Sequence, residues 1–75
     1  MSSIDEVVVA LGAEIKKVRT DAGMTQAELA SLIGVRQPAI VRIEQGQNVP
    51  TWRTLEKIAN ALNVKVNVSF DDSAK

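Results

Sequence analysis

Cysteine, histidine and tyrosine are absent from this chain of 75 residues, which has a single tryptophan and a single phenylalanine. Without cysteine or histidine, disulfide bonds, zinc-finger spacings, thiol nucleophiles and imidazole general bases are all excluded. No paired carboxylates share a helix face either. We therefore expect no enzyme activity, no metal site and no cofactor.

Long hydrophobic runs are missing as well. The longest, from Val7 to Leu11, is far shorter than the ~20 residues that span a bilayer. Asp5 and Glu6 stand where a secretory signal would be basic. The sequence therefore predicts one cytoplasmic domain covering residues 1–75, with no membrane association.

Helix start and stop signals predict four helices. Ser3 with Glu6, and Thr25 with Glu28, have the spacing of capping boxes. Pro38 falls in a first helical turn, where a missing amide is tolerated. Stop residues that suit a left-handed backbone follow at Gly23, Gly34, Gly46 and Asn63. Together with the apolar spacing, these signals place helices at about 4–22, 26–33, 37–45 and 52–62.

The hydrophobic period changes after the fourth predicted helix. Four apolar residues, Val64, Val66, Val68 and Phe70, alternate with polar ones, which predicts a β-strand over about 65–70 before a polar tail at 71–75. One strand cannot satisfy its own backbone, and in a homogeneous solution its partner is the same segment of a second copy. The four apolar residues are thus the predicted interface of a homodimer. A frayed tail, or pairing within the chain, is the alternative.

Two of the predicted helices are short and joined by a tight turn at Gly34, which is the pattern of a helix-turn-helix. Ala30 is small where these helices cross, and Val35 is expected to fill the core. Ile40 and Ile43 form the inner face of helix 37–45. The outward face of that helix is polar and is expected to lie in the major groove of double-stranded DNA.

The spacing of many residues carries a family resemblance. The matching positions are Gln26-Ala27-Glu28-Leu29-Ala30, Gly34-Val35, Gln37-Pro38-Ala39-Ile40, Ile43-Glu44, Gly46, Pro50 and residues 55–62. Over about residues 11–64 the chain resembles the phage-repressor and Cro type of helix-turn-helix, also called XRE-like. The resemblance implies an all-α, lambda-repressor-like domain of four helices that binds a palindromic operator as a dimer. Many members end in a fifth helix, where this chain has the predicted strand.

The resemblance and the side-chain chemistry together assign the DNA contacts. Arg pairs with guanine and Gln with adenine, and an apolar side chain contacts the thymine methyl. The predicted base contacts are Arg36, Gln37, Val41 and Arg42; the predicted phosphate contacts are Gln26, Gln45, Gln47, Asn48 and Arg53. The alternative for each is an ordinary solvated surface residue. Arg36 also replaces a capping Ser or Thr, at an expected cost of ~1 kcal/mol.

Arg19 and Glu44 have a structural role in this interpretation. In the family an equivalent pair links the first helix to the end of the third. Removing one partner of a buried ion pair strands the other charge, at a cost of about 3–5 kcal/mol.

The net charge of zero seems to argue against DNA binding, but it averages unlike regions. Residues Val7 to Phe70 include eight basic and five acidic residues, a difference of +3, and the ends carry the remaining acids. So small an excess predicts modest nonspecific affinity and a shallow salt dependence for one copy. Specific binding should then require the dimer.

The sequence thus predicts a transcriptional regulator that binds a palindromic operator as a dimeric repressor. The alternative is an antitoxin, of the HipB or HigA sort, that binds a toxin protein and regulates its own operon. The predicted strand and the apolar residues Ile4, Val7, Val8 and Val9 motivate that alternative.

Overall fold

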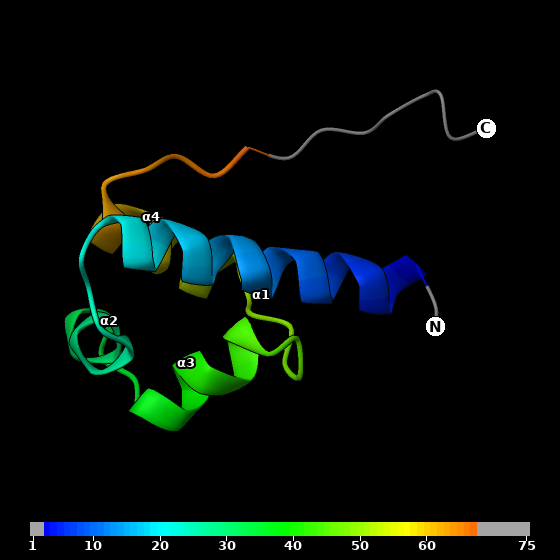
Figure 1. Cartoon of the computed structure of the whole chain (residues 1–75), viewed down its shortest axis with the longest axis horizontal. Helices are drawn as coiled ribbons and strands as arrows, with labels where there is room; N and C mark the ends of the chain where they lie inside the picture. Colours follow the sequence, from blue (N-terminus) through cyan, green and yellow to red (C-terminus); the bar gives the residue numbers. More distant parts are fainter. Residues whose placement is uncertain (1–2, 68–75) are drawn as a thin grey trace.

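The computed structural model describes residues 3–67, and these form four helices. The helices are α1 (Ser3–Asp21), α2 (Gln26–Ile33), α3 (Gln37–Glu44) and α4 (Trp52–Leu62). Each helix begins and ends within one residue of its predicted position. The long helix α1 lies across the others, α2 and α3 pack on one side of it, and α4 lies behind (Figure 1). No helix in the described range is both long and apolar enough to cross a membrane.

The helix ends follow local signals. The Thr25 hydroxyl accepts a hydrogen bond from the Glu28 N–H at 3.0 Å, and the Glu28 carboxylate accepts one from the Thr25 N–H at 3.0 Å. This is the predicted capping box. Gly34 ends α2 with φ 75°, a conformation that glycine adopts without steric cost. The chain then turns directly into α3.

The core lies where all four helices meet. Its buried members are Ile15, Leu29, Ala30, Ile33, Ile40, Ile43, Ile58 and Leu62. Val35 is not among them, because its side chain is 36% exposed. The prediction that Val35 fills the core is therefore wrong. Its backbone N–H instead donates to the Ala30 carbonyl at 3.0 Å, so this residue closes the end of α2.

Helix α1 rests directly on the end of α3 at Gly12. A Cβ atom at Gly12 would lie 2.3 Å from the Ile43 carbonyl oxygen and 2.8 Å from that of Glu44. One turn earlier in α1, Val9 lies against Gly46 in the same way, with its Cγ2 2.8 Å from the Cβ position. Gly12 therefore permits a close helix crossing, and that crossing positions α3.

The prediction of a strand is not supported. Residues 65–67 have no regular secondary structure, and the described residues include no strand at all. A ladder needs a second extended chain, and the rest of the described chain is helical or forms short turns. Val64 and Val66 instead lie beside α1 and α4, while the predicted interface residues Val68 and Phe70 lie outside the described residues.

Candidate nucleic-acid interface

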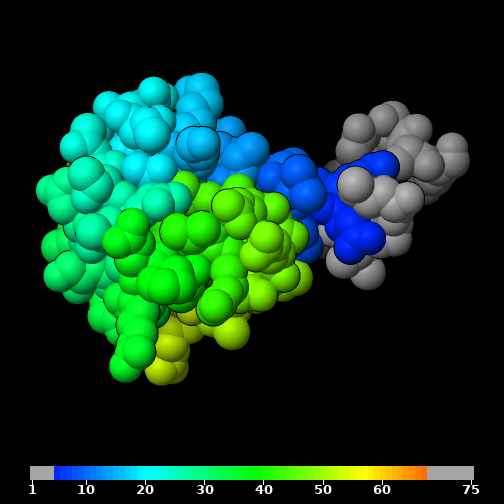
Figure 2. All heavy atoms as spheres, turned by 60° about the horizontal axis from the view of Figure 1, so that its bottom comes forward, coloured from blue at the N-terminus to red at the C-terminus, as the bar shows by residue number. Residues whose placement is uncertain are grey.

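Helix α3 has one buried and one outward face. Its buried residues are Ile40, Ile43 and Glu44. The outward side is a shallow hollow, lined by Gln37, Pro38, Val41, Arg42, Gln45 and Gln47. Figure 2 shows α3 in green at the surface that faces the viewer. The fold thus brings five of the predicted DNA contacts to one hollow, because the roughly two turns of α3 and the loop that follows share that side.

Four other predicted contacts lie outside this hollow, and one of them, Gln26, is half-buried at the start of α2. Arg36 precedes α3, Asn48 lies in the loop after it, Arg53 is in the first turn of α4, and all three are exposed. The side chains of Arg36, Arg42 and Arg53 make no ion pair within residues 3–67. Three uncompensated cations therefore remain available to an anionic partner.

Arg36 is the N-cap residue of α3 and makes no side-chain capping bond, as predicted. The loss of helix stability from the missing cap is smaller than the sequence suggests, because few backbone N–H groups in the first turn of α3 lack a hydrogen-bond partner. Pro38, the second helical residue, has no N–H, and the Ala39 N–H already donates to the Arg36 carbonyl at 3.0 Å. The long cationic side chain thus occupies this position at little expense to the helix.

A buried ion pair joins α1 to α3. Arg19 donates from Nε to Glu44 Oε2 at 2.6 Å and from Nη2 to Glu44 Oε1 at 2.9 Å, which is a bidentate contact. Its third nitrogen, Nη1, donates to the Met24 carbonyl at 2.8 Å. The two side chains are 8% and 2% exposed. This is the pair that the resemblance implied.

The same carboxylate also holds α2. Gln26, the first residue of α2, donates from Nε2 to Glu44 Oε1 at 3.0 Å. Burial disfavours the charged form of Glu44, but the hydrogen bonds from Arg19 and Gln26 and the charge of Arg19 outweigh it and leave the pKa of Glu44 below its ordinary value. The hydrogen bond to Glu44 in turn raises the pKa of Arg19. Both groups are thus charged at neutral pH.

The bond from Gln26 to Glu44 was not foreseen from the sequence. The sequence predicts that Gln26 contacts a phosphate, and the structure shows that its side chain also contacts Glu44. One N–H of its amide remains uncommitted, since a primary amide has two. Gln26 and Glu44 lie in different helices, α2 and α3, with a turn between them, so only the tertiary fold could reveal the contact.

These elements define the class of protein. The short helices α2 and α3 are joined by a turn at Gly34, and α1 packs against α3. The outward face of α3 carries polar side chains that no other part of the described chain covers. This arrangement is a helix-turn-helix DNA-binding domain.

The chain belongs to the helix-turn-helix family HTH_3, whose model matches residues 15–68. It is a family of DNA-binding transcriptional regulators, which confirms the resemblance to the Cro and phage-repressor type.

Individual relatives agree with this assignment. An HTH-type transcriptional regulator of Archaeoglobus fulgidus is 42% identical over 60 residues, which cover 77% of this chain and 86% of the relative. The ImmF control region 10 kDa protein of Bacillus phage phi105 is 36% identical over 58 residues, covering 77% and 64%. Among solved structures, the restriction-modification controller protein C.AhdI from Aeromonas hydrophila aligns with a TM-score of 0.78 at 28% identity, covering 81% of this chain and 88% of that one.

Proposed function

We propose that this protein is a sequence-specific repressor that binds a palindromic operator as a dimer, with α3 in the major groove. The observation that carries the proposal is the hollow on the outward face of α3, where Gln37, Val41 and Arg42 meet. Arg and Gln side chains read base edges through paired hydrogen bonds, and each good pair contributes roughly 1–3 kcal/mol of discrimination.

The contacts divide into two kinds. Arg36, Gln37, Val41 and Arg42 reach the bases. Around them, Gln26, Gln45, Gln47, Asn48 and Arg53 contact phosphates, which fix the position of the protein on the duplex and carry no sequence information. Gln26 is held for this purpose by Glu44, at 3.0 Å. The remaining N–H of its amide is the donor to the phosphate.

Two copies supply what one copy lacks. With a basic excess of +3 between residues 7 and 70, a single domain neutralises few phosphates and binds DNA modestly. A two-fold dimer reads two half-sites about one helical turn, roughly 34 Å, apart. We place the dimer interface in the C-terminal segment that contains Val64, Val66, Val68 and Phe70.

Selection of binding sites from random duplex DNA tests this function, because it reports binding, symmetry and half-site spacing together. The selected duplex then serves in titrations of variants. Arg42→Ala should lower the preference for the selected site by about 5- to 150-fold, which corresponds to 1–3 kcal/mol. Gln26→Ala should weaken binding to all sequences alike, since it removes a phosphate contact.

Lys57→Ala is the matched control for Arg42→Ala. It removes the same charge from an exposed position in α4 that lines a different surface, with Leu32 and Asn60. Its site preference should equal that of the original protein. If selected and scrambled duplexes bound with equal affinity, the proposal would be refuted. The relatives named above are regulators and a phage control-region protein, which favours regulation over toxin neutralisation.

A further inference from the structure

Helix α3 carries two apolar side chains on its outward face. Pro38 is exposed and Val41 is half-buried, and both line the hollow. The buried face of the helix consists of Ile40, Ile43 and Glu44. In a helix with about 3.6 residues per turn, Pro38 lies opposite the centre of that buried face. Its ring is therefore near the middle of the outward face, in the first turn of α3.

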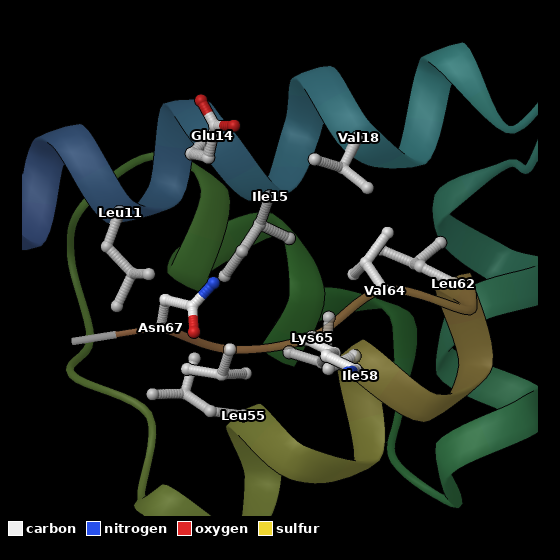
Figure 3. A pocket seen from close by; sticks show the side chains of 12 residues that line it. Leu11, Glu14, Ile15, Val18, Leu55, Ile58, Leu62, Val64, Lys65 and Asn67 are labelled. Atoms are coloured by element: carbon white, nitrogen blue, oxygen red, sulfur yellow. The ribbon is translucent and has the colours of Figure 1, made fainter.

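These two apolar side chains do not serve the core. In the groove between α1 and α4 (Figure 3), Leu11, Val18 and Leu55 are half-buried and pack against the core. Among the residues that the structure describes, neither Pro38 nor Val41 belongs to the core or packs against it. Proline suits the start of a helix, but that role uses its backbone and does not account for contacts of its ring. Valine is not a strong helix former either.

Pro38 has Val41 and Arg42 as neighbours, because residues three and four apart meet on a helix surface. All three line the same hollow. Pro38 and Val41 have no side-chain hydrogen-bond donor or acceptor, whereas the Arg42 guanidinium donates the paired hydrogen bonds that guanine accepts. The hollow thus combines an apolar contact with a contact for guanine.

The main apolar group that bases present in the major groove is the methyl group on C5 of a pyrimidine. Thymine carries this group, and cytosine carries it after methylation at C5. The neighbouring base edges differ, since thymine presents an acceptor, O4, and cytosine a donor, N4. Two side chains without polar atoms do not distinguish these edges, so their contact depends on the methyl group alone.

We propose that Pro38 and Val41 read the 5-methyl group of a pyrimidine and make the same contact to thymine and to 5-methylcytosine. Helix α3 advances about 6 Å from Pro38 to Arg42, and base pairs stack about 3.4 Å apart. The methyl group therefore lies within about two base pairs of the guanine that Arg42 contacts. This inference rests on the proposed function, adds Pro38 to the residues that determine specificity, and makes binding sensitive to cytosine methylation.

Uracil substitution tests the methyl contact, because it replaces one methyl group by hydrogen and leaves base pairing unchanged. In the duplex obtained by binding-site selection, each thymine of the half-site is replaced in turn, together with its symmetry-related copy. Substitution at one position should lower the affinity about 4-fold in each half-site, and therefore about 16-fold for the two. Uracil at thymines outside the half-sites should leave the affinity unchanged.

Cytosine methylation tests the same contact on a second base. At the sensitive position the T·A pair is replaced by C·G, once with cytosine and once with 5-methylcytosine. The methylated duplex should bind about 16-fold more tightly than the unmodified one, since it regains one methyl contact in each half-site. Equal affinity of the two cytosine duplexes would refute the dependence on the methyl group.

Variants of α3 assign the contact to particular side chains. In the double variant Pro38→Ala with Val41→Ala, the ratio of the affinities for thymine and uracil duplexes should approach one. A purely structural role of Pro38 would weaken binding to both duplexes equally and leave that ratio unchanged. Val7→Ala is the matched control, because it removes the same methyl groups as Val41→Ala from a position in α1 that is 65% exposed. Its ratio should equal that of the original protein.

Two further results would overturn the inference. A selected half-site without thymine, or one in which uracil has no effect at any position, would exclude a methyl contact. A thymine-to-uracil ratio that persists in the double variant would assign the contact to another residue. In both cases the proposed function stands if the selected duplex still binds more tightly than scrambled DNA. Equal binding of selected and scrambled duplexes would refute the proposed function itself, and this inference with it.

Discussion

Replacing Gly12 by alanine tests the close crossing of α1 and α3. Sequence reasoning alone predicts a more stable protein, because Gly→Ala inside a helix gains about 1 kcal/mol. The structure predicts the opposite sign. The added Cβ would lie 2.3 Å from the Ile43 carbonyl oxygen and 3.0 Å or less from two backbone atoms of Glu44, and backbone cannot rotate aside.

The magnitude follows from these two opposing effects. Overpacking costs about 1–3 kcal/mol, and three close backbone contacts place Gly12→Ala at the upper end, so the net loss is about 2 kcal/mol after the helical gain. A domain of this size supplies only about 3–5 kcal/mol in total. At about 4–8 °C per kcal/mol, the melting temperature should fall by about 8–16 °C.

Thermal unfolding followed by circular dichroism measures this effect. Ala13→Gly is the control, because Ala13 is exposed in the same helix and its replacement reports the helix propensity alone, about 1 kcal/mol of destabilisation. DNA affinity should fall with Gly12→Ala as well, since α1 would displace the end of α3 and Glu44 with it. An increase in melting temperature for Gly12→Ala would refute the close-crossing argument.

Three further predictions concern the charged groups. Glu44→Ala strands Arg19 at a cost of about 3–5 kcal/mol, which equals the total stability expected for a domain of this size, so this variant should be largely unfolded even without urea. The double variant with Arg19→Met removes the stranded charge and should recover a cooperative urea transition. The folded pKa of Glu44 lies below its ordinary value of 4.5. The stability that its charge contributes should therefore be complete above that value and disappear as the pH falls through the lower folded pKa. Glu44→Gln should flatten the decline of urea midpoints as the pH falls below 4.5. Arg36→Ser should stabilise the fold by much less than the ~1 kcal/mol of an ordinary N-cap, and so raise the melting temperature only slightly, while it weakens operator binding. A full capping gain would contradict the hydrogen bond from the Ala39 N–H to the Arg36 carbonyl.

The four helices could be predicted from the sequence because their ends depend on local chemistry. Thr25 and Glu28 are three residues apart and cap each other within one turn, and Gly34 needs only its own backbone freedom to end a helix. The predicted DNA contacts on α3 came together for the same reason, since residues of one short helix share a side. The link between Arg19 and Glu44 came from the family resemblance.

Features that depend on tertiary approach or on another molecule could not be predicted in this way. Gly12 reads as a weak point of a helix until the backbone of Ile43 is seen beside it. The contact between Gln26 and Glu44 joins two different helices, so no pattern within one helix predicts it. The alternation that begins at Val64 predicts a strand, but a strand exists only where another extended chain supplies hydrogen bonds. In the described part of the chain, none does.

The Arg19–Glu44–Gln26 network has a consequence for the thermodynamics of association. Its hydrogen bonds, of 2.6 and 3.0 Å, join α1 and the start of α2 to the end of α3. The orientation of α3 is therefore fixed in the absence of DNA. A preorganised surface loses little conformational entropy on binding. Calorimetry should therefore show a negative heat-capacity change that matches the apolar surface buried, without the excess that accompanies coupled folding. The network thus fixes the orientation of α3 within the free protein.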